Sequence, residues 1–129
     1  MEDRRNKRQT IGRRGEDLAC TALQEKGHTI LERNYRNGHL EIDIISASAD
    51  GIHFVEVKAR RESIQAPPQE NVDFTKQRRI AKAANGFLRS HKGIRFGSCE
   101  CHFDIVAVVF TDSTTQLEYF PDAYIPIYL

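Results

Sequence analysis

Two short stretches, LEIDII at residues 40–45 and IHFVEVK at residues 52–58, decide the fold of this 129-residue chain. Each alternates apolar and polar residues, which is typical of a β-strand whose side chains point by turns to its two faces. The Ala, Ser, Asp and Gly residues at 47–51 are typical of a turn. We therefore expect an antiparallel hairpin. Its apolar face is expected to hold four core residues, Ile42, Ile44, Val55 and Val57.

Carboxylates gather on the other face of this hairpin. If the turn closes symmetrically, the numbers of opposed residues sum to about 99, so that Asp43 faces Glu56. The same register makes Glu41 face Lys58. Opposed residues have Cβ atoms roughly 4.5–5.5 Å apart, and two carboxylates at that distance repel unless a cation joins them or one is protonated. A plain charged face remains an alternative, with a Glu41–Lys58 surface ion pair worth at most about 1 kcal/mol.

A divalent ion, Mg²⁺ or Mn²⁺, explains the opposed acids best. Mg²⁺ commonly binds one or two carboxylates together with waters and substrate phosphate oxygens. Beside a phosphodiester it would lower the pKa of an attacking water and neutralise developing charge. We expect Asp43, Glu56 and the backbone carbonyl of Val57 to be its ligands. Lys58, on the face of Glu56, would orient the water or stabilise the transition state.

The rest of the chain predicts one mixed α/β domain at residues 10–129, with helices flanking a mixed central sheet. Residues 1–9 are expected to form a basic, flexible arm, and the polar residues 60–73 a mobile loop. A buried strand after the second helix suggests a right-handed parallel crossover. The expected helices and remaining strands are a helix at about 10–26, a strand at 28–36 closed by an Asn37-Gly38 turn, a helix at about 74–90, and strands at 103–110 and 116–120.

Basic residues are distributed unevenly. All 19 Lys and Arg lie in residues 1–95, whereas residues 96–129 contain five acidic residues and no Lys or Arg. Clusters of Lys and Arg suit a polyanion because they displace condensed counterions from phosphates. Lys76 has two open interpretations, a phosphate contact or a side chain that snorkels to solvent. The expected nucleic-acid contacts are Arg13, Arg14, Arg60, Arg61, Lys76, Arg78 and Arg79.

Other function classes find little support in the sequence. No apolar run approaches the roughly 20 residues that span a bilayer, and the charged N-terminus is unlike a secretory signal, so we expect a cytoplasmic protein with no membrane partner. Three cysteines without an export signal argue against a disulfide framework. The five histidines show no metal-ligand spacing, and His53 is expected at the surface.

Asp43, followed after 12 residues by Glu56-Val57-Lys58, resembles the D-x(n)-(D/E)-x-K motif of the PD-(D/E)XK nuclease superfamily, which has a restriction-endonuclease-like αβββαβ core. An ordered set of motifs over roughly residues 10–110 resembles more closely the YraN-like family, an uncharacterised group of small bacterial proteins related to archaeal Holliday-junction resolvases. These motifs are GE at 15–16, RNYR at 33–36, EID at 41–43, FVEVK at 54–58, KQRR at 76–79 and FDIV at 103–106.

The resemblance implies a Mg²⁺- or Mn²⁺-dependent endonuclease acting on DNA, with branched or otherwise structured DNA as a candidate substrate. It makes Asp43 and Glu56 metal ligands, Lys58 the catalytic lysine and Glu16 a further acidic group of the site. Resolvase-like relatives also make a homodimer plausible. The alternative is a non-catalytic module on the same fold that binds nucleic acid or a protein.

Three acidic residues keep alternative roles. Glu16 lies on the border of the first helix's apolar stripe, so it either points toward the sheet or is a solvated residue favoured by the helix dipole. Asp104, inside an apolar strand, either hydrogen-bonds the end of a helix or supports the site. Glu41 is a further possible support for the site.

Overall fold

The structure is a computed structural model that describes residues 4–62 and 72–126, with the backbone alone for residues 4–8. Its elements follow the order α-β-β-β-α-β-β, which confirms the expected mixed α/β class and contains the αβββαβ core. A short 3₁₀ helix precedes the fourth strand. The bounds are α1 Arg4–Glu25, β1 Thr29–Asn37, β2 Leu40–Ser48, β3 Gly51–Arg61, α2 Phe74–Arg89, the 3₁₀ helix Ile94–Phe96, β4 Cys101–Phe110 and β5 Thr115–Phe120.

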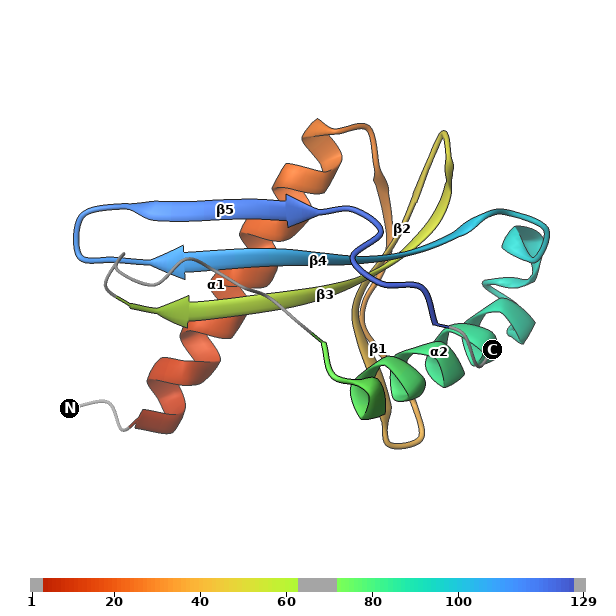
Figure 1. The fold of residues 1–129 in the computed structure, drawn as a ribbon, viewed down its shortest axis with the longest axis horizontal. Helices are drawn as coiled ribbons and strands as arrows, with labels where there is room; N and C mark the ends of the chain where they lie inside the picture. The colour runs from red at the N-terminus through yellow and green to blue at the C-terminus, as the bar shows by residue number, and fades with distance from the viewer. Residues whose placement is uncertain (1–3, 63–71, 127–129) are drawn as a thin grey trace.

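The strands form one five-stranded sheet in the order β1-β2-β3-β4-β5. β3 and β4 run parallel, while the other neighbours are antiparallel. The parallel connection that the sequence predicted is therefore present, and α2 lies within it. The two helices cover opposite faces of the sheet, and α1 crosses behind β3, β4 and β5 (Figure 1).

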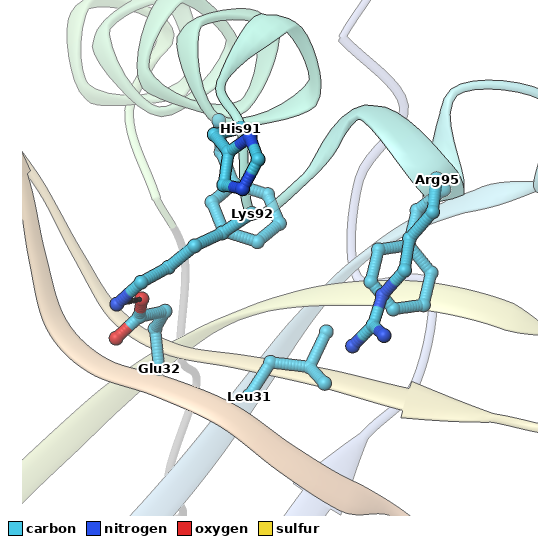
Figure 2. A pocket seen from close by; sticks show the side chains of 7 residues that line it. Leu31, Glu32, His91, Lys92 and Arg95 are labelled. Atoms are coloured by element: carbon cyan, nitrogen blue, oxygen red, sulfur yellow. Dashed lines mark hydrogen bonds and ion pairs between the residues drawn. The ribbon is translucent and has the colours of Figure 1, made fainter.

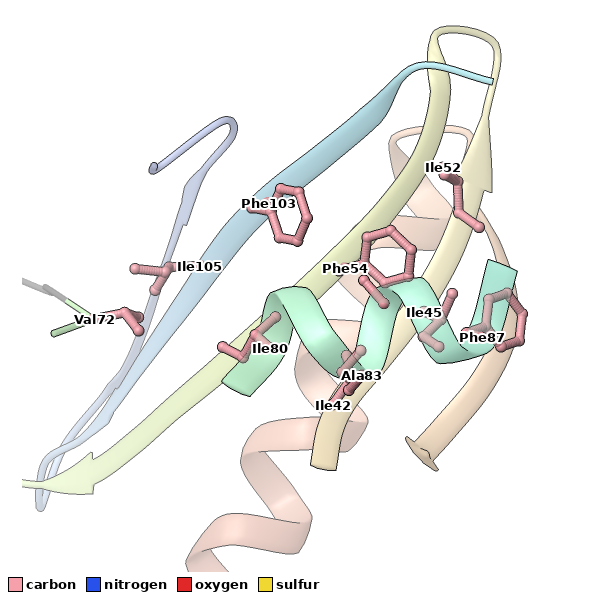
Figure 3. Packing of buried hydrophobic residues seen from close by; sticks show 11 residues of the cluster. Ile42, Ile45, Ile52, Phe54, Val72, Ile80, Ala83, Phe87, Phe103 and Ile105 are labelled. Carbon is pink, nitrogen blue, oxygen red and sulfur yellow. The ribbon is translucent and has the colours of Figure 1, made fainter. Parts of the chain in front are cut away.

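Both faces of the central strands are consequently buried. On the α2 side, Ile45 and Phe54 of the hairpin pack with Ile80 and Phe87 (Figure 3). On the α1 side, a second cluster includes Leu23 of the helix and several apolar residues of the sheet. Burial of apolar surface on both sides stabilises this arrangement, by roughly 1.5–3 kcal/mol for each large side chain fully removed from water.

The prediction that the hairpin has a single apolar face holding all four core residues is wrong. Ile42 belongs to the cluster under α2, whereas Ile44 and Val55 belong to the cluster under α1, against which Val57 also packs. Before Ile44, β2 leaves β3 and continues beside β1 alone, and Asn34 of β1, between the partners of Ile42 and Ile44, has a positive φ of 52° that interrupts the regular strand. Strict alternation across one flat hairpin therefore does not extend to Ile42.

Some element bounds also differ from expectation. α1 begins at Arg4, so part of the expected arm is helical, while residues 1–3 lie outside the described residues. β3 continues to Arg61 because Arg60 and Arg61 pair with β4, and most of the expected loop, residues 63–71, lies outside the described residues. The mobility of the arm and of this loop stays a prediction. Among residues 4–62 and 72–126, no helix is both long and apolar enough to cross a membrane.

Candidate functional site

The sheet divides in two at the candidate site. β2 and β3 pair in the predicted register, with Ile44 opposite Val55 and Ser48 opposite Gly51, so the connecting turn is shorter than expected. Before Ile44, β2 continues beside β1, and after Val55, β3 continues beside β4. The β1–β2 hairpin thus leads away from β3, β4 and β5, and α2 begins near the point of divergence (Figure 1).

Asp43 and Glu56 lie at this division, one residue beyond the last pair of the β2–β3 ladder. The backbone N–H of Val57 donates a hydrogen bond of 2.8 Å to Oδ2 of Asp43. A carboxylate therefore takes the place of a backbone carbonyl as the acceptor for a central strand. Glu56 is buried, with 7% of its surface exposed, whereas Asp43 is partly buried and is held against β3 by its hydrogen bond.

A pocket of about 410 Å³ opens beside these two acids. Its walls come from the end of the β1–β2 hairpin and from the first turns of α2, and Asp43, Glu56 and Glu41 contribute carboxylates to it. The other lining residues are His39, Leu40, Asp73, Thr75, Lys76, Arg79 and Ile80. The pocket is thus acidic at its base, with two cationic side chains from the helix.

Lys76 lines this pocket and reaches Glu56, which agrees with the interpretation in which it reaches into the site, and its contact with a phosphate stays a prediction. Its Nζ lies 2.5 Å from Oε1 of Glu56. Asp73 caps α2 by accepting a hydrogen bond of 2.8 Å from the backbone N–H of Lys76, which fixes the first turn of the helix. Burial disfavours the charged amine, but the hydrogen bond and charge of Glu56 outweigh it and raise the pKa of Lys76.

The pocket retains uncompensated negative charge despite this lysine. Burial and the neighbouring charge of Glu56 raise the pKa of Asp43 to about 7, although the hydrogen bond from Val57 opposes the rise. The charge of Glu16 adds to it. Asp43 therefore exchanges a proton near neutrality, which is the behaviour expected of an acid placed beside other acids in a poorly solvated site.

α1 brings Glu16 toward the sheet through a glycine contact. A Cβ added to Gly15 would lie 2.5 Å from the Cβ of Ala59 in β3, so only glycine permits this approach. Burial raises the pKa of Glu16. Its Oε1 is buried and has no hydrogen-bond partner among the described residues. These observations favour the interpretation in which Glu16 points toward the sheet.

The carboxylates near the division of the sheet have the chemistry that a hard divalent cation prefers, although among the described residues Asp43, Glu56 and Glu16 do not form a group whose ligand atoms all lie within 4.8 Å of one another. Asp43, Glu56 and Glu16 offer oxygen ligands only, which Mg²⁺ and Mn²⁺ prefer. The raised pKa of Asp43 and the unpartnered Oε1 of Glu16 both indicate a place where added positive charge would be stabilising. The carbonyl of Val57 stays a predicted ligand.

Other expected site residues are distributed more widely. Lys58 is half-buried and lies two residues beyond Glu56 in β3, on the same side of the strand. Glu41 is the register partner of Arg36 in β1, and its carboxylate lies 3.8 Å from the Arg36 guanidinium. The β2–β3 ladder ends at Ile44–Val55, so Glu41 and Lys58 are not opposed in it as predicted. Asp104 lies outside the acidic pocket, fully buried within β4.

Only two of the seven residues predicted to contact nucleic acid line the pocket. Lys76 and Arg79 line it. Arg14 instead stacks on Phe110, with its guanidinium carbon 4.7 Å from the ring centre. Arg60 forms an ion pair of 2.6 Å with Glu62. The remaining three side chains, Arg13, Arg61 and Arg78, are exposed.

The sequence interpretation missed a second polar cluster at the other end of the β2–β3 hairpin. His53 is buried and not at the surface, since only 3% of it is exposed, and it stacks on His102 with ring centres 4.5 Å apart. Asp104 accepts hydrogen bonds from His53 and from the hydroxyl of Tyr119. The signal was a histidine inside an apolar strand: a buried polar side chain requires partners, which must come from elsewhere in the chain.

The charge state of this cluster follows from its hydrogen bonds. Burial raises the pKa of a carboxyl group, but bonds from His53, Tyr119 and the backbone N–H of Asp122 reverse this and lower the pKa of Asp104. Burial would lower the pKa of His102, but its bonds to the Asp50 carbonyl and the Asp122 carboxylate raise it to about 9. The cluster is thus an ordered arrangement of opposite charges.

A further cavity of about 350 Å³ lies between β1 and the end of α2. Leu31 and Phe87 contribute to its lining, and Lys92 bonds Glu32 at its edge with an Nζ–Oε1 distance of 2.7 Å (Figure 2). Lys92 and Arg95 make this cavity cationic. It has no pair of acidic side chains, so the acidic pocket is the better candidate for metal-assisted chemistry.

Comparison with known proteins identifies the family. The model of "Uncharacterised protein family UPF0102" matches residues 15–108. The chain belongs to the UPF0102 family. The matched range includes all residues that line the acidic pocket, and also Glu16 and Lys58.

Similar proteins extend over most of the chain. A UPF0102 protein of Anaeromyxobacter dehalogenans is 38% identical over 91% of this chain and 85% of its own length. One from Chlorobium chlorochromatii is 45% identical over 76% of this chain and 73% of its own, and one from Dictyoglomus turgidum is 40% identical over 88% and 96%. The YraN-like resemblance seen in the sequence is therefore confirmed at the level of the family.

Proposed function

We propose that this UPF0102 member is a Mg²⁺- or Mn²⁺-dependent endonuclease that hydrolyses phosphodiester bonds in DNA. The observation that carries the proposal is the meeting of Asp43 and Glu56 where β2 and β3 separate, with the pKa of Asp43 raised to about 7 by burial and by Glu56. Sites with this excess of negative charge are characteristic of catalytic and metal-binding positions.

Six side chains in or near the pocket have a role in this proposal. Asp43 and Glu56 would hold the divalent ion, with Glu16 adding charge from α1. The bound ion would supply Lewis-acid polarisation of the phosphate and would lower the pKa of a nearby water. Lys58 would orient the nucleophile or stabilise the charged phosphate. Lys76 and Arg79, which line the pocket, would contact the phosphodiester backbone and give no sequence preference.

A non-catalytic binding module is the second candidate, and one observation favours it. Lys76 already provides a cation for Glu56 within the chain itself. A protein that used this internal ion pair permanently would not need a metal. Its cationic side chains would then bind nucleic acid or an acidic protein surface without turnover.

A cleavage assay on branched and linear DNA with Mg²⁺ or Mn²⁺ separates the two candidates. We expect wild-type protein to cut, and Asp43→Asn and Glu56→Gln to lose at least about 100-fold in rate while they still bind DNA. Asp112→Asn, in the turn after β4, is a matched control that should cut normally. DNA binding by wild-type protein with no cutting in either metal would support the binding module, and equal cutting by Asp43→Asn would exclude the proposed site.

A further inference from the structure

The second polar cluster unites residues from separate parts of the chain at the turn end of the β2–β3 hairpin. Asp50 belongs to the turn, His53 to β3 and His102 to β4, where His53 and His102 are ladder partners. We propose that Asp50, His53 and His102 form a second metal site, for a transition-metal ion of the zinc type. This site is separate from the acidic pocket, which does not include any of the three residues.

The three side chains already present their ligand atoms to a common point. Nε2 of His53 lies 2.8 Å from Oδ1 of Asp50, and Nε2 of His102 lies 3.8 Å from Oδ2 of Asp50. One ligand atom from each residue lies within 4.8 Å of the other two. Ligands of a tetrahedral zinc ion are ~3.4 Å apart, given bonds of about 2.0–2.1 Å. Small side-chain shifts would therefore be enough to close the site.

Both histidines are oriented by carboxylates on their far side. Nδ1 of His53 lies 2.7 Å from Oδ2 of Asp104, and Nδ1 of His102 lies 2.7 Å from Oδ1 of Asp122. An ionised carboxylate only accepts hydrogen bonds, so each Nδ1 must carry the proton. A histidine that binds metal through Nε2 characteristically donates its Nδ1–H to a carboxylate in this way.

The Nε2 atoms point toward groups that also accept hydrogen bonds. Nε2 of His102 lies 3.0 Å from the backbone carbonyl oxygen of Asp50, and Nε2 of His53 faces the Asp50 carboxylate. Such contacts are compatible with a proton on each ring, balanced by the neighbouring carboxylates, or with a cation between the groups. In the first case two charged rings lie 4.5 Å apart and three carboxylates balance them. One divalent ion gives the same total charge at a single point between the rings and the carboxylate.

The ligand set and its access decide the class of ion. Two imidazoles and one carboxylate favour Zn²⁺ and its neighbours such as Co²⁺, whereas Mg²⁺ prefers oxygen ligands alone. The histidine side chains are 4% and 8% exposed, but that of Asp50 is 63% exposed, which leaves an entry path from solvent. The hydroxyl of Ser48, 2.8 Å from Nε2 of His53, or a water would complete the coordination.

The test uses full-length protein freed of metal by a chelator and titrated with Co²⁺, followed by visible absorption, and with Zn²⁺, followed by calorimetry. We expect one tight Co²⁺ site with the spectrum of a nitrogen- and oxygen-bound ion, distinct from weaker binding by the oxygen ligands of the acidic pocket. Asp50→Ala removes an exposed side chain and should weaken binding at least about ten-fold without unfolding the protein. Asp122→Asn, which changes only the orienting group of His102, should weaken it about 10- to 100-fold.

Matched variants make each outcome decisive. Asp112→Ala removes an exposed aspartate from a different turn, and Asp43→Asn changes the acidic pocket; both should keep the tight Co²⁺ and Zn²⁺ site of the wild-type protein. The proposal is overturned if Asp50→Ala binds normally, if Asp43→Asn abolishes binding, or if a thiolate charge-transfer band reveals Cys99 or Cys101 as ligands. These outcomes do not depend on whether the protein cuts DNA.

Discussion

Gly15 of α1 lies so close to Ala59 of β3 that a Cβ on Gly15 would be 2.5 Å from the Cβ of Ala59. Real carbon atoms do not approach this closely without strain. The contact sets the distance of α1 from the sheet next to Glu16. It therefore links a backbone requirement in the helix to the position of a carboxylate at the candidate site.

Gly15→Ala should destabilise the protein by about 1–3 kcal/mol, because helix or strand must move apart to accept the methyl group. Gly12→Ala is the matched control in the same helix, since a Cβ there would meet nothing within 4 Å. That variant should gain about 0.5–1 kcal/mol from reduced chain entropy. Urea unfolding measures the stability of both variants. Equal stability would show that α1 and the sheet can accept the added methyl group without strain.

Asp43 should make the metal-free protein less stable as pH rises. Its pKa is about 7 in the folded state, against an ordinary value of 3.8, so between these values the folded state binds more protons than the unfolded state. Stability therefore falls from about pH 4 to pH 7. Asp43→Asn should remove this fall and, above pH 7, exceed wild-type stability by an amount on the order of 2 kcal/mol.

The measurement is urea unfolding in chelator across this pH range, with Asp112→Asn as the control for an exposed carboxylate. Wild-type protein and Asp43→Asn should converge at the acidic end. A gap that stayed constant at every pH would mean that Asp43 does not titrate differently on folding.

Lys76→Met should destabilise the metal-free protein by about 1–3 kcal/mol, because it leaves Glu56 buried without its cation. Lys82→Met, an exposed lysine on the same helix, should change stability by less than about 0.5 kcal/mol. If Mn²⁺ binds between the acids as proposed, saturating Mn²⁺ should reduce the loss seen with Lys76→Met. Thermal unfolding with and without Mn²⁺ measures this, and a loss no greater than that of Lys82→Met would count against the ion pair.

Asp73→Ala should cost about 0.5–2 kcal/mol, since it removes the side-chain acceptor for the backbone N–H of Lys76 at the start of α2. Asp73→Ser keeps an oxygen at the cap and should recover most of this loss. Urea unfolding of the three proteins tests the assignment. If alanine and serine were equally tolerated, the cap would have no role in stability.

The hairpin and the acids could be predicted from the sequence because both depend on local periodicity. Alternation along residues 40–45 and 52–58 gave strands, and the turn between them set a register that the structure confirms from Ile44 to Ser48. The apolar run at 103–110 likewise predicted the buried strand. Periodicity could not predict that β2 and β3 separate at Asp43, since that choice depends on β1 and β4.

Features made by distant segments were beyond local patterns. Lys76 reaches Glu56 only because the parallel crossover returns α2 beside the hairpin. The second cluster joins residues from four regions of the chain, so the spacing of residues in the sequence does not predict it. Its members include Asp50, His53, His102, Asp104 and Asp122. The sequence feature that indicates this cluster is the presence of polar residues within apolar strands, and not the spacing of ligands.

One hairpin thus holds residues of both proposed sites. The five paired positions from Ile44–Val55 to Ser48–Gly51 lie between the acids and the turn that bears Asp50. A slip of the strands by one residue would move every side chain of the shifted strand to the opposite face of the sheet. Such a slip would displace side chains in both polar clusters at once. Both clusters therefore depend on the length of the Ala49-Asp50 turn, and an insertion in this turn should disturb both of them.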